Sequence, residues 1–465
     1  MLINIEYDET DPKSIEKYAQ KLIGYTFKQM CAQYGNKVDY SVNEKKARKG
    51  GLGDLVEEVY FKYENNSDSR PDFYKAGVEL KVTPYKINQD GTKSAKERLI
   101  ITMIDYCQVV NETFEDSHLW YKAHLMLIIY YLYQQSVTSR LDYRIDYARL
   151  FSPPEQDLAI IKSDFEKIVA KIKAGKAHEL SEGDTLYLGA ATKSSDSSKR
   201  RAQPFSDIPA KPRAFSYKTS YMTHVLNNYI IPGKTSYESI LKDSVVPDFE
   251  LYVQQKINAY VGKSQEELSI LFEIDNQKKK KNLGSMLAFR MLGITSNNAE
   301  EFAKANIVVK TIRLNKDNKI KENMSFPNFK FTEIINEEWE DAAFPTLLRE
   351  TKFLFIVYKF SESGDLILKG CQFWNMPDTT IESDVKTVWS KTKKLIADGL
   401  QFEIVNGEYH SNLPKQTENP VCHVRPHGRN SKDTYDLPDG RPYPKQCFWL
   451  NNSYIKDQLD DSFLS

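Results

Sequence analysis

The alternation of apolar and polar residues predicts a helix followed by a strand in the N-terminal part of the chain. In the segment 52–63, apolar residues recur at steps of three and four, which is the spacing of one helix face. These residues are Leu52, Leu55, Val56, Val59, Tyr60 and Tyr63. The polar segment 64–70 is typical of a loop. Residues 76–83 then alternate with period two, so we expect a strand with Glu79 and Lys81 on one face and apolar side chains on the other.

Other segments of the chain have equally clear patterns. The apolar run 124–133 predicts a second strand, and apolar residues at helical spacing predict a helix over 154–174. Two polar segments, KSSDSSKRR at 193–201 and QKKKK at 277–281, are expected to be solvated loops. Because the first precedes the segment DIPAKPRAF and carries several cations, it is also a candidate for a loop that closes over a phosphate backbone.

Four segments of the first half recur in the second half, in the same order and at a nearly constant offset. The pairs are KGGLGDLVEEVYF (49–61) with KNLGSMLAFRMLG (281–293), PDFYKAGVELKVTPY (71–85) with EEFAKANIVVKTIRL (300–314), HLWYKAHLMLIIYY (118–131) with LLRETKFLFIVYKF (347–360), and FSYKTSYM (215–222) with FWLNNSYI (448–455). We therefore expect two copies of one domain. Their predicted bounds are 1–232 and 245–465, joined by a linker at 233–244.

Composition and charge exclude several classes of protein. A chain of 465 residues with 40% hydrophobic and 28% charged residues fits a globular protein of two domains. Its apolar runs are shorter than the roughly 18–20 residues that span a bilayer. Lysine and arginine together number 64, as do aspartate and glutamate, and this zero net charge argues against a protein that coats DNA by bulk electrostatics. It does not exclude a nuclease whose basic loops contact phosphates.

The cysteines and the N-terminus point to the cytoplasm. The five cysteines are scattered and form no CxxC pair, so neither a zinc module nor a disulfide framework is expected. The N-terminus, MLINIEYDETD, is acidic and lacks the apolar core of a signal peptide.

The chemistry-bearing residues lie on and before the strand predicted at 76–83. Cleavage of a phosphodiester requires a divalent metal beside the scissile phosphate, held by hard oxygen ligands. Asp72 and Glu79 supply two carboxylates, and the backbone carbonyl of Leu80 is a further candidate ligand. Lys81 is two residues from Glu79 on the same strand face, where an amine can orient the attacking water or stabilise charge at phosphorus. As a spacing alone, this set is equally compatible with a solvated edge strand.

The second half keeps the framework of this site without its acids. In the aligned repeats, Glu57 corresponds to Ala288 and Glu79 to Val308, whereas Asp72 falls opposite Glu301 and Lys81 opposite Lys310. A valine at the Glu79 position cannot bind a metal. We therefore expect the second half to fold similarly but not to cut.

At these residues the sequence closely resembles the MutH family of DNA endonucleases. The matching run is KGGLGDLVE…PDFYKAGVELKVTP, with WYK at 120–122 downstream. The two halves in tandem resemble the larger members of that family, the type II restriction endonucleases that cut at 5′-GATC-3′. Further matching segments are 175–193, 204–222, EEWED (337–341), CHVRPH (422–427) and FWLNNSYIK (448–456).

The resemblance implies an α/β fold with a restriction-endonuclease-like PD-(D/E)xK core, a mixed sheet flanked by helices, present twice in tandem. It also implies Mg²⁺ as the cofactor and double-stranded DNA with two GATC sites as the partner. The metal-binding acids fall on Asp72 and Glu79, the catalytic lysine on Lys81, the helix acid on Glu57 and an assisting lysine on Lys122. Cleavage before the G of each strand would leave 5′ overhangs, and the second half would act as an inactive, allosteric effector domain.

Basic residues in both halves are predicted to contact DNA. In the first half these are Lys193, Lys199, Arg200, Arg201 and Arg213, and in the second half Arg425 and His427. Arginine is well suited to the O6 and N7 atoms of guanine, although a phosphate contact or plain solvation is the commoner role of any one such residue. A zinc site of Cys422, His423, His427 and Cys447 is disfavoured by its tight spacing, and HELSE at 178–182 lacks the second histidine of a zinc-protease helix.

Two other functions remain open at this point. A strand-nicking mismatch-repair endonuclease is disfavoured because such relatives have one domain. A DNA-binding regulator that does not cut is disfavoured by the intact set of Asp72, Glu79 and Lys81. Whether the chain acts as a monomer or as a dimer formed on DNA is also open.

Overall fold

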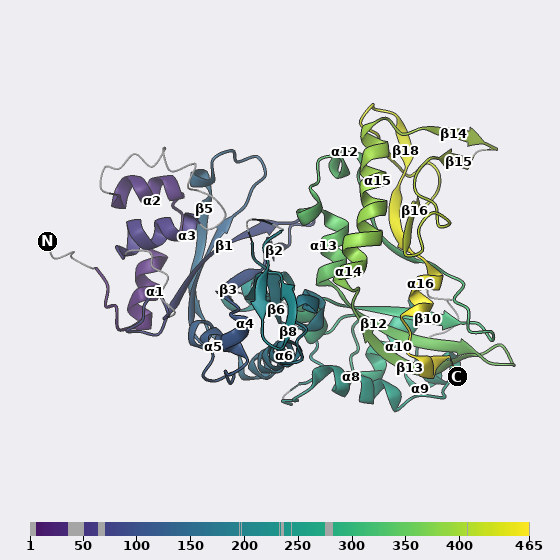
Figure 1. The fold of residues 1–465 in the computed structure, drawn as a ribbon, viewed down its shortest axis with the longest axis horizontal. Helices are drawn as coiled ribbons and strands as arrows, with labels where there is room; N and C mark the ends of the chain where they lie inside the picture. The colour runs from purple at the N-terminus through teal and green to yellow at the C-terminus, as the bar shows by residue number, and fades with distance from the viewer. Residues whose placement is uncertain are drawn as a thin grey trace. The chain divides into compact units, whose positions relative to one another are not determined.

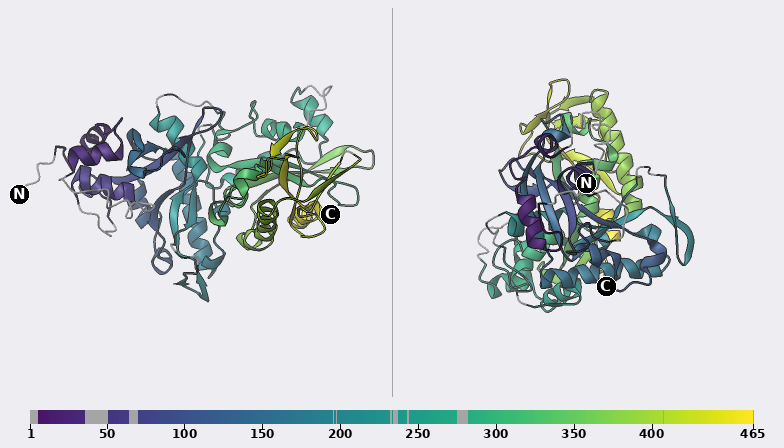
Figure 2. Two further views of the ribbon diagram at one scale, coloured as in Figure 1. Left: turned by 90° about the horizontal axis from the view of Figure 1, so that it is seen from above. Right: turned by 90° about the vertical axis from the view of Figure 1, so that its left-hand side faces the viewer.

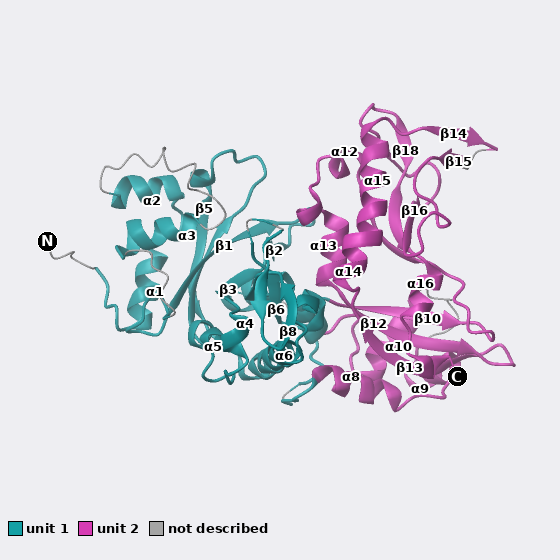
Figure 3. Cartoon of the chain, in the orientation of Figure 1, with its two compact units in different colours: residues 1–248, 300–306 teal, residues 249–299, 307–465 magenta. Residues whose placement is uncertain are grey.

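The computed structural model describes residues 6–35, 51–63, 70–194, 196, 198–231, 233, 237–242, 244–274, 282–406 and 408–464 (Figure 1). The chain forms two compact units (Figure 3). Unit 1 contains residues 1–248 and 300–306, and unit 2 contains 249–299 and 307–465. The predicted linker at 233–244 thus lies within unit 1, and unit 1 also takes seven residues from the second half of the sequence, 300–306.

A mixed four-stranded sheet forms the first part of unit 1. Its order is β2 (Lys93–Ala95), β1 (Glu79–Ile87), β4 (Met126–Leu132) and β5 (Arg144–Phe151). Strands β1 and β4 are parallel, and the two outer pairs are antiparallel. Strand β1 pairs with β4 from Glu79 to Tyr85 and with β2 only at residues 85–87. Glu79 and Thr83 are buried, as is Leu80. The charged face predicted for this strand is therefore internal.

The N-terminal helices cover one face of this sheet. They are α1 (Pro12–Gln20), α2 (Phe27–Tyr34) and α3 (Gly51–Leu55), and they lie beside the sheet strands in all three views (Figures 1 and 2). The Asp11 carboxylate caps α1, and Thr26 and Gln29 form a capping box on α2, which satisfies free backbone N–H groups at both helix starts. Their apolar sides meet the strands in one hydrophobic core.

The predicted helix at 52–63 is present, but its second half is wider than an α-helix. After α3 the chain continues as a π-helical turn, Val56–Phe61, which ends at Lys62 in a left-handed conformation with φ of 64°. The apolar positions predicted for the buried face, including Val56 and Tyr60, are buried. Periodicity identified the correct face but carried no information on the π turn.

A second, antiparallel sheet completes unit 1. Its order is β3 (Leu99–Met103), β9 (Arg213–Tyr217) and β6 (Leu188–Thr192). A hairpin of β7 (Arg201–Gln203) and β8 (Ser206–Ala210) joins β6 to β9. The predicted helix at 154–174 is α6 (Glu155–Lys173), which packs Phe165 against Phe215 of this sheet. The shorter helices of unit 1 are α4 (Tyr106–Val109), α5 (His118–Ala123), α7 (Thr219–Val225) and α11 (Glu300–Ala305).

Unit 2 also contains two sheets. One is mixed, with one parallel and one antiparallel strand pair, and the other is antiparallel. The first has the order β10 (Ile307–Leu314), β12 (Lys352–Phe360) and β13 (Leu366–Trp374), with β10 and β12 parallel. The second has the order β11 (Met324–Phe329), β19 (Gln446–Leu450) and β16 (Cys422–Pro426). Two hairpins, β14 (Phe402–Val405) with β15 (Glu408–Ser411) and β17 (Thr434–Asp436) with β18 (Pro442–Pro444), extend from it.

Helices accompany these sheets. They are α8 (Phe249–Asn258), α9 (Gln265–Leu271), α10 (Leu283–Met291), α12 (Phe331–Ile334), α13 (Ala343–Glu350), α14 (Asp378–Thr380), α15 (Lys386–Ala397) and α16 (Asn452–Asp457). Of these, α12, α13, α15 and α16 contribute residues to one large core with the strands. Within the described residues, no helix of either unit is long and apolar enough to cross a membrane.

Helix α11 is held in unit 1 by buried charges. The Lys304 ammonium lies 2.7 Å from Asp157 on α6 and 2.7 Å from Glu300. The carboxylate of Glu301 accepts hydrogen bonds from the backbone N–H groups of Ile240 and Leu241. Lys304 and Asp157 are each at most 4% exposed, so each charge depends on the other for compensation.

We expect Lys304→Met to destabilise unit 1 strongly. The substitution leaves the Asp157 carboxylate buried without its cation, a change that costs about 3–5 kcal/mol. Lys319→Met is the matched control, because Lys319 and Asp317 form an exposed pair worth about 0–1 kcal/mol. Urea unfolding followed by circular dichroism measures both. Equal midpoints for the two variants would contradict the assigned role of the buried pair.

Candidate active site

Asp72, Glu79 and Lys81 converge at the start of β1. A small turn closed by the hydrogen bond from Phe73 N to Val78 O places Asp72 beside the strand. One Asp72 oxygen, Oδ2, accepts a hydrogen bond of 2.8 Å from the N–H of Leu80. The Nζ of Lys81 lies 2.7 Å from Oε1 of Glu79. Glu79 and Lys81 therefore lie on one face at the start of β1, as the period-two pattern predicted, and Asp72 lies beside them.

A second lysine reaches the same carboxylate from a helix. Lys122 lies in the last turn of α5, whose first turn is capped by the Ser117 hydroxyl. Its Nζ lies 3.3 Å from both Glu79 oxygens. The Nζ of Lys81 also donates to the carbonyl of Ile101 in β3, at 3.4 Å. Glu79 is only 2% exposed, and two ammonium groups compensate its charge.

Two further acids are electrostatically coupled to this group. Burial, followed by the charges of Asp72 and Asp54, raises the pKa of Glu57 to about 7. Burial, followed by the charge of Glu79, raises the pKa of Asp72 to about 6, although Lys81 acts in the opposite direction. Several carboxylates thus share a space of limited solvation. Such a cluster favours a bound cation, because the cation removes the repulsion between them.

Tyr63 belongs to the same group and was not selected from the sequence. Burial and the charges of Asp72, Glu57 and Glu79 raise the pKa of its phenol well above the usual value. Among the described residues, its buried hydroxyl has no hydrogen-bond partner. The sequence analysis treated Tyr63 only as an apolar position of a helix. Its position two residues beyond the π turn, which brings the ring to the acids, has no signature in the hydrophobic pattern.

The donor set fits a hard divalent cation. No group of three or more His, Cys, Asp or Glu side chains arranged to hold a metal occurs in the part of the chain that the structure describes. Asp72 and Glu79 nevertheless offer two carboxylates. The backbone carbonyl of Leu80, the residue after Glu79 in β1, is the third candidate ligand. Two carboxylates with substrate and water oxygens are a common way of binding Mg²⁺. The arrangement is compatible with a metal that binds together with its substrate.

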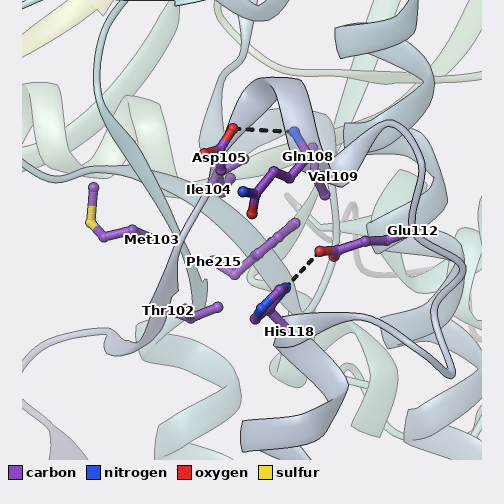
Figure 4. A pocket seen from close by; sticks show the side chains of 9 residues that line it. All are labelled: Thr102, Met103, Ile104, Asp105, Gln108, Val109, Glu112, His118 and Phe215. Atoms are coloured by element: carbon purple, nitrogen blue, oxygen red, sulfur yellow. Dashed lines mark hydrogen bonds and ion pairs between the residues drawn. The ribbon is translucent and has the colours of Figure 1, made fainter. Parts of the chain in front are cut away.

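A pocket of about 100 Å³ occurs in unit 1, and Asp72, Glu79 and Glu57 are not among its lining residues (Figure 4). Its lining comes from the end of β3, from α4 and from the start of α5. Figure 4 shows the His118 ring facing Glu112, with Nδ1 2.7 Å from Oε1. None of the predicted catalytic residues lines it. The site described above is therefore defined by its charged groups and not by a cavity.

The predicted DNA-contact residues are placed unevenly. Lys193, Lys199, Arg200 and Arg201 are exposed, as are Arg425 and His427. Arg213 is only 3% exposed and donates from Nη1 to the carbonyl of Ala190 at 2.6 Å. The prediction that Arg213 contacts DNA is therefore wrong for this structure, because the guanidinium holds β9 to β6 inside the protein. Residues 195, 197 and 277–281 of the two polar segments lie outside the described residues.

The structure also argues against the zinc alternative. Cys422, His423 and Cys447 are buried, whereas His427 is exposed. The Nδ1 atom of His423 is 2.6 Å from the amide oxygen of Asn451. Burial raises the pKa of the Cys447 thiol to about 11, so this group is not a ready thiolate ligand.

Comparison with known proteins identifies the family. The family model described as DNA mismatch repair enzyme MutH matches residues 61–164. The type II restriction enzyme Sau3AI of Staphylococcus aureus is 38% identical over 461 residues, which cover 90% of this chain and 93% of that enzyme. The chain therefore belongs to the MutH family of DNA endonucleases. It is a type II site-specific deoxyribonuclease, and it acts on double-stranded DNA.

Other relatives match about half of the chain. The DNA mismatch repair protein MutH of Shewanella baltica (strain OS185) is 27% identical over 224 residues, which are 47% of this chain and 95% of that protein. MutH of Vibrio campbellii is 25% identical over 223 residues, again 47% of this chain. The MutH-like restriction endonuclease fold is thus shown for the region that contains Asp72, Glu79 and Lys81.

The raised pKa values of Glu57 and Asp72 predict how pH affects stability without a metal. A carboxyl whose pKa is raised on folding stabilises the protein below its unfolded pKa, and this contribution is lost as pH rises through its folded pKa. In EDTA, these two groups should therefore lower stability between about pH 4 and pH 7, by a few kcal/mol in total.

Thermal melting with and without Mg²⁺ measures this effect. Mg²⁺ should raise the melting temperature at pH 8 more than at pH 5, because it binds the ionised carboxylates. Asp72→Asn should reduce the shift, whereas Glu58→Gln, at an exposed position of the same helix, should preserve it. The same Mg²⁺ shift at both pH values, or an undiminished shift in Asp72→Asn, would be incompatible with a metal at these acids.

Proposed function

We propose that the protein cleaves double-stranded DNA at 5′-GATC-3′ with Mg²⁺ as its cofactor, leaving 5′ overhangs. The observation that carries this proposal is the convergence of Asp72, Glu79 and Lys81 at one end of β1. The near full-length similarity to Sau3AI supports the reaction class, and the MutH resemblance of the sequence supplies the recognition site. We also propose the cytoplasm as its location.

Each residue has a distinct part in the proposed mechanism. Asp72, Glu79 and the Leu80 carbonyl would hold the metal, which would supply acidification of the attacking water and stabilisation of charge on the phosphate. The Lys81 ammonium, now 2.7 Å from Glu79, orients the attacking water and donates to a phosphate oxygen. The Lys122 ammonium also compensates the negative charge of Glu79, so Lys81 can turn from Glu79 to the substrate. Water loses a proton and attacks phosphorus, the bond from phosphorus to the 3′ oxygen breaks, the 3′ oxygen takes a proton from solvent, and the phosphate remains on the 5′ end.

Glu57 completes the proposed centre from the helix side. Its pKa of about 7 makes it the acid of this group that gains and loses a proton near neutral pH. We propose that it accepts a proton from water at the metal site. This assignment depends on the charge coupling of Glu57 to Asp72 and Glu79, which indicates that the three carboxylates share one space.

We further propose that unit 2 is a second, inactive copy that binds another GATC site and activates unit 1. The strand registers support this alignment. Glu79 pairs with Met126 and Val308 pairs with Phe353 in parallel ladders. The pairing of β4 with β5 is irregular after Tyr130, and that of β12 with β13 is irregular after Val357, four residues beyond Met126 and Phe353 respectively. These registers support the proposed equivalence of Val308 and Glu79.

The remaining positions of unit 2 are also unsuited to cleavage. Ala288, at the Glu57 position, is fully buried. Glu301, at the Asp72 position, is used in unit 1, where it caps the backbone at Ile240 and Leu241. A Cβ on Gly284 would lie 2.2 Å from the Thr311 hydroxyl, which shows that α10 approaches β10 closely. Within the described residues of unit 2, these features therefore support the proposal that this unit does not cut.

The alternative of a strand-nicking repair enzyme has less support. The MutH repair proteins match only 47% of this chain, whereas the restriction enzyme Sau3AI matches 90%. A regulator that does not cut would have no need of the buried Glu79 with its two lysines.

Cleavage of plasmids with one or two GATC sites tests the function. With Mg²⁺ we expect double-strand cuts at GATC and at least tenfold faster cutting of the two-site plasmid. No cutting is expected in EDTA. Nicking of one strand only would favour the repair alternative, and binding without cutting would favour the regulator. Equal rates on both plasmids would exclude activation through a second site.

Substitution of equivalent lysines separates the two units. Lys81→Met should lower the cutting rate by about 10²–10⁴-fold, the range for loss of one electrostatic or proton-transferring group. Lys310→Met should leave cutting unchanged, because Lys310 lies over the Phe326 ring and burial lowers its pKa. Asp72→Ala should abolish cutting but retain DNA binding. Rates come from single-turnover digestion, and the assignment fails if Lys81→Met cuts normally.

A further inference from the structure

An arginine in unit 2 is stacked on a tryptophan at the protein surface. The guanidinium carbon of Arg425, in β16, lies 5.0 Å from the ring centroid of Trp449 in β19. The indole N–H of Trp449 donates to the carbonyl of Arg425 at 3.3 Å. The His427 ring meets Trp449 edge-on, at 5.2 Å. Arg425 and His427 are exposed, so the three residues form a fixed, solvent-facing cluster.

The corresponding sheet of unit 1 has no such cluster. In unit 1, Leu188 pairs with Tyr217, and in unit 2, Cys422 pairs with Leu450. With the strands aligned in this register, Trp449 takes the place of Ser216 and Arg425 that of Ala191. Both residues of unit 1 are at most 1% exposed. Small buried residues at these two positions are therefore compatible with the sheet of unit 1. The fold of such a sheet does not require the Trp449–Arg425 pair of unit 2.

The chain beside this cluster is strongly basic. Residues 425–432, RPHGRNSK, are exposed and contain no acid. The next residue, Asp433, is compensated, because its carboxylate lies 2.5 Å from Lys445 and accepts from the backbone N–H of Arg429. The segment therefore carries local positive charge although the whole chain is neutral. This is the charge distribution expected of a surface that binds a phosphate backbone.

We propose that duplex DNA binds this face of unit 2 and that Trp449 positions Arg425 to read a guanine. Stacking and the indole hydrogen bond fix the arginine, which reduces the entropy lost when it binds. A guanidinium held in one plane suits the O6 and N7 atoms of guanine, which accept two parallel hydrogen bonds. His427, Arg429 and Lys432 contact phosphates. This inference rests on the proposed binding of a second DNA site by unit 2.

The number of duplexes bound per chain provides the test. The full chain with Asp72→Ala, which should not cut, is titrated calorimetrically with a short GATC duplex, and two bound duplexes are expected. Adding Trp449→Ala or Arg425→Ala should leave one. Trp449→Phe keeps a ring for stacking and should restore two. Lys394→Ala, which removes an exposed cation on α15 of the same unit, is the matched control and should bind two.

The outcomes separate this inference from the function of unit 2. If the parent chain binds only one duplex, the proposed second site itself fails. If the parent and Trp449→Ala both bind two, only the role of the cluster is overturned. If Arg425→Ala weakens GATC and scrambled duplexes equally, Arg425 contacts phosphate and the base-reading assignment is wrong. A loss of at least tenfold for GATC alone supports it. Melting curves verify folding, and Arg425→Ala remains informative if Trp449→Ala does not fold.

Discussion

The buried carboxylate of Glu79 sets the conditions for the rest of the catalytic unit. An acid on an interior strand is stable only with compensating charge, and Lys81 from the same strand and Lys122 from α5 provide it. This requirement fixes α5 next to β1. Lys81 also bonds the Ile101 carbonyl of β3, which links the two sheets of unit 1. The charge of Glu79, which the proposed chemistry requires, thus also constrains how the two sheets of unit 1 pack against each other and against α5.

The two units differ in the residues at the start of their parallel strand pairs. Parallel strands β1 and β10 have corresponding registers, but only β1 carries a glutamate at its start. In unit 2, Gly284 of α10 lies close to Thr311 of β10. Lys310, the residue before Thr311, lies over the Phe326 ring. The polar cluster that we propose binds DNA lies on the second sheet of this unit.

The sequence predicted the strand of Glu79 and Lys81 and the helix before it, because both depend on local periodicity. It did not predict the π turn that brings Tyr63 to the acids, because hydrogen-bond spacing within a helix leaves little trace in hydrophobicity. It also misplaced Arg213, since a cation near a basic loop looks exposed until the packing of β9 against β6 is known. Burial of polar groups depends on tertiary contacts, and those contacts are set by residues distant in sequence.

The assignment of α11 to unit 1 has a consequence for how this family of chains can be divided. The polypeptide passes from one unit to the other at residues 248–249, 299–300 and 306–307. A fragment ending at the predicted linker would lack α11, and Asp157 would keep its place in the interior without Lys304. The first half of the gene therefore encodes an incomplete unit 1, whereas the second half encodes all of unit 2 together with α11. A recombination event at the sequence midpoint would separate partners that the folded protein needs together.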